Sequence, residues 1–377
     1  MFAPTAADRI GKHASPPPAA QITALQRIQE YPAISVLLTT TPAAQLTQAD
    51  ALRLRALASR AIHRVSTELQ PAAARPAAQR LANLVNQART APTSHALAIY
   101  ASASTEALLR LPIPVRDRAV VDPTFATRDL VLAMHRAPNH LVLAFDTARA
   151  TLLYTAGDAV LPALTAAFPM HAPPRRRHRG RGHADRQCRT GRRTGTDDDF
   201  YRQVDAALGA YLRWHPAPLV LVGSDWALGA FQRVSLNTDR VAGVVRGNVN
   251  NASAAHLATR TRAALDTYLG RRRDETLALI ARRAAAGRVA SGVPAAWYAA
   301  RTIAPEVLAV DESLFYPARI SDDGDTLNLA DDVEHPDVTD DAVDELIELV
   351  LARGGWIAMT GPGTLDRHDG VALAVRT

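Results

Sequence analysis

The chain has 377 residues, 47% hydrophobic and 5% aromatic, which is enough for two or three domains with apolar cores. Its net charge of +6 is unevenly placed, because residues 175–193 hold nine arginines and one aspartate, a charge of +8. The single cysteine excludes a disulfide framework within the chain, and no apolar run reaches the roughly 18 residues of a membrane span. We therefore expect a cytoplasmic protein with no membrane contact.

The first third of the chain is predicted to form an α/β domain. Residues 1–21 are rich in Pro and Ala and lack the apolar core of a signal peptide, so we expect a disordered tail. The N-terminal domain then spans 22–124, where apolar residues recur at helical or strand spacing. Its helices and strands are predicted over 22–31, 33–40, 49–69, 75–88, 95–102 and 107–112.

A middle α/β domain is predicted over 125–252, interrupted by a basic loop at 172–197. The run NHLVLAFDTARATLLYT (139–155) reads as two apolar strands joined in a hairpin. The remaining elements are predicted as helices at 127–137, 200–214 and 225–235 and strands at 218–224 and 241–249.

The C-terminal α/β domain is predicted over 253–377. It opens with a long helix over 254–287, in which Gly270 is a candidate break. A helix and a strand follow over 292–313, and helix, strand, turn and strand close the chain. The acidic run from Asp322 to Glu345 lacks a calcium-loop pattern and is interpreted as a solvated surface. Strands alternating with helices predict the α/β class, in three consecutive domains.

The basic loop is the segment that most needs explaining. It has no apolar period with which to bury a face, so we expect it to be exposed. RNA is the natural partner, because guanidinium groups bind phosphates bidentately; a solubilising loop without a partner is the alternative. The candidate RNA-binding residues are Arg175, Arg176, Arg177, Arg179, Arg181, Arg186, Arg189, Arg192 and Arg193.

The sequence contains no complete motif for a metal site, a phosphate-binding loop or a catalytic nucleophile. His171, His178 and His183 lack cysteine or carboxylate ligands at zinc-like spacing. No phosphate loop ends in Gly-Lys-Ser/Thr, and Ser224 lacks the Gly-x-Ser-x-Gly elbow of a nucleophile. We therefore predict no metal and no cofactor.

Six segments in order resemble one family. They are ISVLLTTTP, HALAIYAS, NHLVLAFDTARATLLYT, APLVLVGSDWALGAFQRV, GVVRGNVNNAS and the closing LIELVLARGGWIAMTGPG…GVALAVR. Together they are similar to the class I release factors of archaea and eukaryotes and to their relatives, the bacterial archaeo-eukaryotic release factor family. The resemblance implies three α/β domains, of which the last is similar to RNA-binding ribosomal proteins. It also implies a ribosome or tRNA as partner, with a possible protein partner at the C-terminal domain.

The resemblance also gives the basic loop an expected role. In members that terminate translation, this loop carries Gly-Arg-Gly-Gly-Gln, whose glutamine helps water release the nascent peptide. Here Gly180, Arg181 and Gly182 match the first three positions, while His183 replaces the next glycine and Ala184 the glutamine. The resemblance therefore implies a translation-related protein without peptide-release activity.

Two alternatives stay open. In the first, the altered loop tip hydrolyses peptidyl-tRNA or RNA, with His183 and Gln187 as weak catalytic candidates. In the second, the chain is a protein-docking module without an RNA partner, and the basic loop and the acidic run bind other proteins.

Overall fold

The computed structural model describes residues 17–146, 148–157, 159–163, 165–173, 186–247, 253–331, 335 and 337–376; for residues 156 and 186–197 it describes the backbone alone. Contacts divide the chain into two compact units. One contains Asn139–Gly270 and is called the middle unit. The other, the paired unit, combines Ala14–Pro138 (the N-terminal lobe) with Arg271–Thr377 (the C-terminal lobe).

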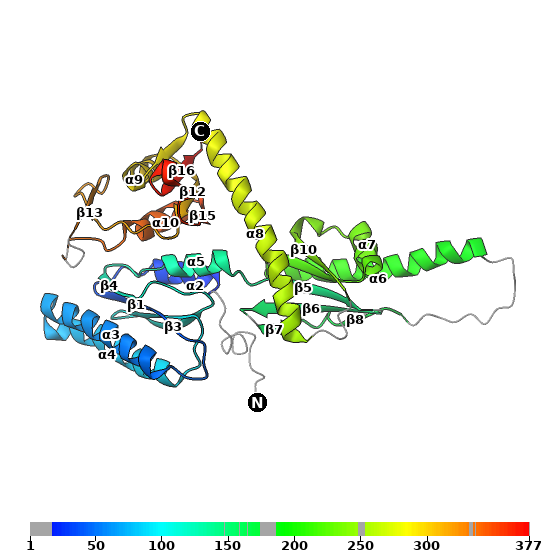
Figure 1. Ribbon diagram of the computed structural model, residues 1–377, viewed down its shortest axis with the longest axis horizontal. Helices are drawn as coiled ribbons and strands as arrows, with labels where there is room; N and C mark the ends of the chain where they lie inside the picture. Colours follow the sequence, from blue (N-terminus) through cyan, green and yellow to red (C-terminus); the bar gives the residue numbers. More distant parts are fainter. Residues whose placement is uncertain are drawn as a thin grey trace. The chain divides into compact units, whose positions relative to one another are not determined.

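The N-terminal lobe is a four-stranded antiparallel sheet in the order β3-β2-β1-β4, with helices on both faces (Figure 1). Its central strand β1 is buried on both sides. Ile34, Val36 and Leu38 face the helices α3 and α4, while Leu37 faces α2 and α5. The elements are α2 Ala19–Gln26, β1 Ala33–Thr39, α3 Gln48–Glu68, α4 Pro71–Thr90, β2 Ala96–Ala101, β3 Glu106–Leu111, β4 Arg118–Asp122 and α5 Arg128–Arg136.

The C-terminal lobe has a four-stranded sheet in the order β11-β16-β12-β15, where β12 is parallel to β15 and antiparallel to β16. One apolar core runs through both lobes, because Leu130 of α5 clusters with Leu346 and Ile347 of α10. The elements after the long helix α8 Ala254–Ala285 are β11 Val289–Ser291, α9 Val293–Thr302, β12 Pro305–Asp311, β13 Ala318–Ile320, β14 Leu327–Leu329, α10 Ala342–Ala352, β15 Trp356–Thr360 and β16 Val371–Val375.

The middle unit is built on a six-stranded sheet in the order β10-β9-β5-β6-β7, with β8 paired to β6. The predicted hairpin is confirmed, since Leu141 pairs with Tyr154 in an antiparallel register. The helices α6 and α7 pack on one face, and the first part of α8 packs on the other. The elements are β5 Leu141–Asp146, β6 Arg149–Ala156, β7 Ala159–Pro162, β8 Met170–His171, α6 Arg186–Trp214, β9 Leu219–Gly223, α7 Asp225–Val234 and β10 Val241–Arg246.

Three features differ from the sequence analysis. Helix α5, counted in the middle domain, lies in the paired unit because its apolar face joins the core of the two lobes. Helix α8 runs through Gly270 without a break, since one glycine costs a helix only about 1 kcal/mol. Helix α6 starts at Arg186, inside the expected loop, because arginine favours helices and no proline follows before Phe200.

The α/β class is confirmed, with one of the three large sheets in each predicted domain. The predicted domain boundaries stay a prediction. Within the described residues, no helix is long and apolar enough to cross a membrane.

Candidate functional site

The basic loop is only partly described. Arg175, Arg176, Arg177, Arg179, Gly180, Arg181, Gly182, His183 and Ala184 lie outside the described residues. Arg186, Gln187, Arg189, Arg192 and Arg193 belong to helix α6, where the backbone alone is described. The roles expected for these side chains therefore stay predictions.

The described residues that frame this segment are firmly packed. Before it, β8 pairs with β6, with Ala150 opposite Met170. After it, the ring of Tyr201 on α6 meets Phe145 of β5 edge to face at 5.4 Å between centroids. Farther along α6, Val204 and Leu208 are fully buried in the same core. Residues 175–193, called the arginine-rich segment from here on, are therefore flanked on both sides by residues that pack in the same sheet and its covering helices.

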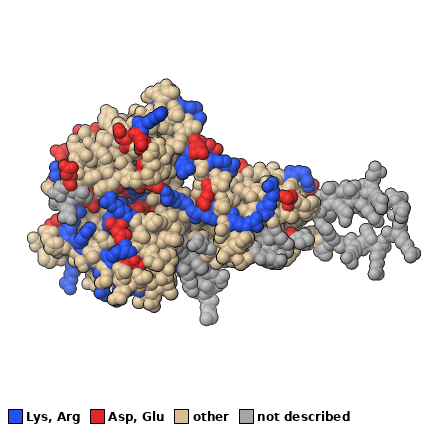
Figure 2. Space-filling model, viewed as in Figure 1, with Lys and Arg blue, Asp and Glu red and all other residues tan. Residues whose placement is uncertain are grey.

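Elsewhere in the described part of the chain, many surface arginines have acidic neighbours. Figure 2 shows basic and acidic side chains interspersed on the face in view. Examples are Arg246 beside Asp225 at 2.7 Å and Arg272 beside Glu275 at 3.1 Å. This local pairing agrees with the charge count, in which the net positive charge belongs to residues 175–193.

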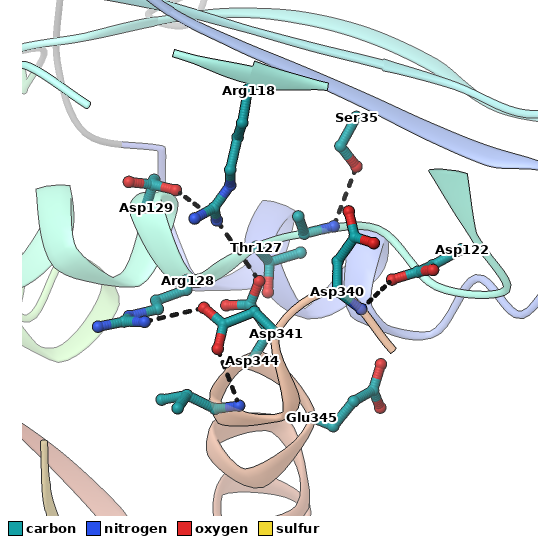
Figure 3. Close-up of polar contacts among 12 residues, drawn as sticks. Ser35, Arg118, Asp122, Thr127, Arg128, Asp129, Asp340, Asp341, Asp344 and Glu345 are labelled. Atoms are coloured by element: carbon teal, nitrogen blue, oxygen red, sulfur yellow. Dashed lines mark hydrogen bonds and ion pairs between the residues drawn. The ribbon is translucent and has the colours of Figure 1, made fainter. Parts of the chain in front are cut away.

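A second polar site lies where the two lobes of the paired unit meet (Figure 3). The sequence analysis interpreted Asp322 to Glu345 as a solvated surface, and for its last part this was wrong. Asp340, Asp341 and Asp344 are only 6%, 5% and 7% exposed. They are buried because the start of α10 packs against residues of the N-terminal lobe that bring arginines to meet them.

Arg128 of α5 makes the most extensive contact in this site. Its guanidinium donates to Oδ2 of Asp341 at 2.9 Å and to the carbonyls of Asp311 and Glu312, each at 2.9 Å. It also donates to the carbonyl of Leu314. Asp341 in turn caps helix α10, since its Oδ1 accepts the amide of Val343 at 3.2 Å. One buried arginine of the N-terminal lobe thus holds the loop before β13 and the start of α10 together.

Two more arginines of the N-terminal lobe approach the same carboxylates. Arg118 of β4 donates to Asp129 at 2.9 Å and lies 3.7 Å from Oδ2 of Asp344. Arg64 of α3 lies 3.6 Å from Oδ1 of Asp340. The separations of 3.6 and 3.7 Å are longer than usual hydrogen bonds, so Asp340 and Asp344 are only partly neutralised.

Other carboxyl groups in the joint meet neutral or acidic neighbours. Oδ2 of Asp122 accepts the amide of Asp340 at 3.4 Å, so two carboxyl-bearing residues are in contact. Glu348 accepts a hydrogen bond from Thr127 at 3.1 Å across the lobes. Glu345 accepts one from Thr124. No described residue donates a hydrogen bond to Oδ1 of Asp344, although this oxygen is buried.

Burial makes these groups hold their protons more tightly than in water. Burial, aided by the nearby Asp340, raises the pKa of Asp122 to about 7. Burial raises the pKa of Asp340 to about 6 against the opposing effect of Arg64. Burial and the neighbours Glu345 and Asp344 raise the pKa of Glu348 to about 9. The pKa of Asp344 also lies well above its usual value, through burial and the charge of Asp341.

The space beside these groups is small. A cavity of about 10 Å³ is lined by Arg118, Asp122, Asp340, Asp344 and Glu345 among others. This is room for roughly one water molecule. The site can hold protons and a water but is too small for an organic substrate. Among the described residues, no group of three His, Cys, Asp or Glu side chains is placed to hold a metal ion.

Comparison with known proteins identifies the middle of the chain. Residues 139–302 match the family described as bacterial archaeo-eukaryotic release factor family 3. This part of the chain is release-factor-like. This confirms the resemblance seen in the sequence and relates the chain to translation, while the reading of the altered loop motif stays a prediction. No curated protein matches the chain.

Several solved structures are similar at low identity. S. cerevisiae Dom34, a translation termination-like factor interacting with Hbs1, has 8% identity and a TM-score of 0.42, with 74% of this chain and 73% of that chain covered. A ribosome-bound archaeal Pelota, in a model with ABCE1, has 12% identity and a TM-score of 0.44, covering 97% and 96%. The archaeal termination factor aRF1 has 14% identity and a TM-score of 0.24, covering 95% and 97%. TM-scores below 0.5 are too low to support an argument about function.

The sequence analysis missed the polar site in the joint. Asp340, Asp341, Asp344 and Glu345 belong to the acidic run that was interpreted as a solvated surface, and Glu348 lies in the helix expected after it. The one available signal was the apolar pattern of α10, whose buried residues alternate with these acids. That pattern implies a helix packed on a neighbour, which brings the adjacent acids to the edge of the contact.

Proposed function

We propose that this chain is a ribosome- or tRNA-associated, translation-related protein that binds RNA through its arginine-rich segment and does not release nascent peptide. The observation that carries the proposal is the family match over residues 139–302, which includes residues 175–193. In that segment nine arginines accompany a loop motif that ends in His183 and Ala184 instead of Gly and Gln.

The physical support for RNA binding is the charge of this segment. A charge of +8 from nine arginines and one aspartate within nineteen residues suits a row of phosphates, and arginine binds phosphate with two parallel hydrogen bonds. Such contacts release counterions, so the affinity falls with salt by about 0.7 to 0.9 in log–log slope for each phosphate bound. The expected signature is a steep loss of affinity as salt rises.

The test compares two triple variants of equal charge change. Replacing Arg175, Arg176 and Arg177 by Ala should reduce the slope for binding to tRNA or ribosomes by about 2 to 3. Replacing Arg271–Arg273 of α8, a second run of three arginines, should leave the slope nearly unchanged. Equal effects of the two variants would remove the special role of the loop. A slope that neither variant changes would favour the protein-docking alternative.

The absence of peptide release has its own test. Release requires a flexible tip and a side-chain amide beside the ester, and loss of one such polar group commonly costs about 10² to 10³ in rate. His183 removes the glycine freedom and Ala184 has no polar side-chain atom. We expect wild-type protein to release labelled peptide from stalled ribosomes no faster than the background rate. Release well above background would contradict the proposal, and release by His183→Gly with Ala184→Gln would support the motif alignment.

The hydrolase alternative predicts a different result. If the altered tip cleaves peptidyl-tRNA or RNA, turnover should be measurable with wild-type protein and should disappear in His183→Ala or Gln187→Ala. Binding without turnover, with the same affinity in both variants, leaves the non-catalytic proposal standing.

A protein partner at the C-terminal lobe is proposed as well. Several large apolar side chains there are exposed, with Tyr298 at 56%, Leu329 at 63% and Trp356 at 39%. Aromatic side chains such as those of Tyr298 and Trp356 are enriched at protein interfaces. Crosslinking to ribosome-bound proteins through a photoreactive group at position 298 should label a partner, and labelling equal to that of a group at exposed Leu236 of the middle unit would count against it.

A further inference from the structure

Carboxyl groups of both lobes converge on the joint of the paired unit, and they outnumber the arginines that face them (Figure 3). The facing arginines come from three elements of the N-terminal lobe: Arg64 from α3, Arg118 from β4 and Arg128 from α5. The carboxyl groups are Asp122, Asp129, Asp340, Asp341, Asp344, Glu345 and Glu348. With every group ionised, the closed joint would carry excess negative charge away from water, which is costly.

The contacts show which carboxyl groups have little positive charge close to them. Glu348 has one hydrogen bond, from the neutral Thr127, and its charged neighbours are Glu345 and Asp344. Asp344 has Arg118 at 3.7 Å and no described donor to its Oδ1. Asp122 meets the backbone of Asp340 and, at greater range, Arg64 and Glu345. By contrast, Asp129 and Asp341 each bond an arginine at 2.9 Å.

These three carboxyl groups all lie at the contact between the two lobes. Asp122 stands on the N-terminal lobe, whereas Asp344 and Glu348 stand on α10 of the C-terminal lobe. Each contacts the opposite lobe, since Asp122 accepts the amide of Asp340, Asp344 lies beside Arg118, and Glu348 accepts a hydrogen bond from Thr127. Separation of the lobes would return all three carboxyl groups to water, where they ionise freely.

We propose that the joint between the N-terminal and C-terminal lobes is a proton-operated latch, which closes when Asp122, Asp344 and Glu348 hold protons and loosens when they lose them. The contact between Arg128 and Asp341 aligns the lobes, while the carboxyl groups with little positive charge beside them set how tightly the lobes close. The ligand that controls the joint is the proton.

The raised pKa values determine whether opening of the joint becomes more or less favourable as pH rises. Asp122 shifts from 3.8 to about 7 and Glu348 from 4.5 to about 9 in the closed state. A group whose pKa is raised by closing contributes its full stabilisation below its open-state pKa and loses it as pH rises through the closed-state pKa. Opening should therefore become more favourable from about pH 4 upward. Between pH 7 and 9 Glu348 contributes about a tenfold rise in the opening constant per pH unit, and Asp344, whose pKa is also raised by burial, adds to this rise.

Hydrogen exchange of backbone amides in α5 and α10 measures this opening directly. Rates at pH 6 to 9 are divided by the intrinsic exchange rate at each pH, which leaves the opening constant. In wild-type protein this constant should rise by at least about tenfold per pH unit above pH 7, while that of α7 in the middle unit should not change. Glu348→Gln keeps the shape of the side chain without its charge. It should reduce the rise of the opening constant per pH unit by a factor of about ten.

The matched control is Glu275→Gln on α8, where the glutamate is exposed beside Arg272. It should leave the pH dependence of α5 and α10 unchanged. Protection that does not depend on pH, or the same pH dependence in Glu348→Gln as in Glu275→Gln, would overturn the latch. If Glu348→Gln loses its fold, shown by lost protection in α7 or lost circular dichroism, Asp344→Asn provides a second test, because removing this buried carboxyl group should also reduce the rise of the opening constant with pH.

Discussion

Replacing Arg128 by Met should destabilise the paired unit strongly. Arg128 and Asp341 have side chains only 5% and 4% exposed, so removing the guanidinium leaves a carboxylate buried without its charge partner. Loss of one member of a buried ion pair costs about 3–5 kcal/mol. The carbonyls of Asp311, Glu312 and Leu314 lose their donor as well, which places the expected value toward the upper end.

Urea unfolding followed by tryptophan fluorescence is a suitable assay for this variant. Trp297 of the C-terminal lobe is 5% exposed, whereas Trp214 and Trp226 of the middle unit are 83% and 55% exposed. Unfolding of the paired unit should therefore dominate the change in emission. The midpoint shift, with an unchanged slope, gives the loss of free energy of unfolding.

A control variant and a double variant sharpen the Arg128 test. Arg136→Met removes a neighbouring arginine of α5 that is 51% exposed and paired with Glu312, and it should cost about 1 kcal/mol or less. Combining Arg128→Met with Asp341→Asn removes the stranded charge and keeps the helix cap, so the double variant should be more stable than Arg128→Met alone. Equal losses for Arg128→Met and Arg136→Met would refute the argument that burial decides the cost.

Two further predictions concern the helices that cover the sheets. A Cβ on Gly243 would lie 2.9 Å from the Cβ of Ala264, so Gly243→Ala should destabilise the middle unit by about 1–3 kcal/mol, whereas Gly229→Ala in α7 meets nothing within 4 Å and should stabilise it by up to about 1 kcal/mol. Thermal unfolding of both variants checks this, and the opposite order would be a contradiction. Thr47 caps α3 by accepting the amide of Asp50 at 3.1 Å, so Thr47→Ala should cost about 1 kcal/mol and Thr47→Ser should restore most of it.

The sequence predicted those elements whose pattern is local. The continuous apolar run of β1 and the amphipathic repeat of α3 carry their own burial signal, and the hairpin of β5 and β6 follows from two apolar strands with a short turn. The start of α6 was missed because the residues after Arg186 have no apolar period. A helix without apolar periodicity cannot be predicted from a hydrophobic pattern.

The polar site could not be predicted because its two halves are far apart in the chain. From the sequence alone Asp344 is expected to be solvated. Its burial depends on Arg118 and on the apolar face of α5, which packs with α10 in one core. The charge of the arginine-rich segment was visible from composition alone, and the family resemblance from short ordered segments, because neither depends on long-range packing.

The pairing of the two lobes also has a consequence for synthesis of the chain. The hydrogen bonds from Thr124 and Thr127 join residues 221 positions apart, and those from Arg128 span 183 to 213. At roughly 5–20 residues per second, the N-terminal lobe waits about 10–40 s on the ribosome before these partners emerge. During that interval Asn139–Gly270, which holds all strands of the middle unit's sheet, can complete that sheet. Meanwhile the apolar surface of α2 and α5 that later packs against the C-terminal lobe remains uncovered. We therefore expect aggregation and chaperone binding mainly at this stage, before the C-terminal lobe has been synthesised.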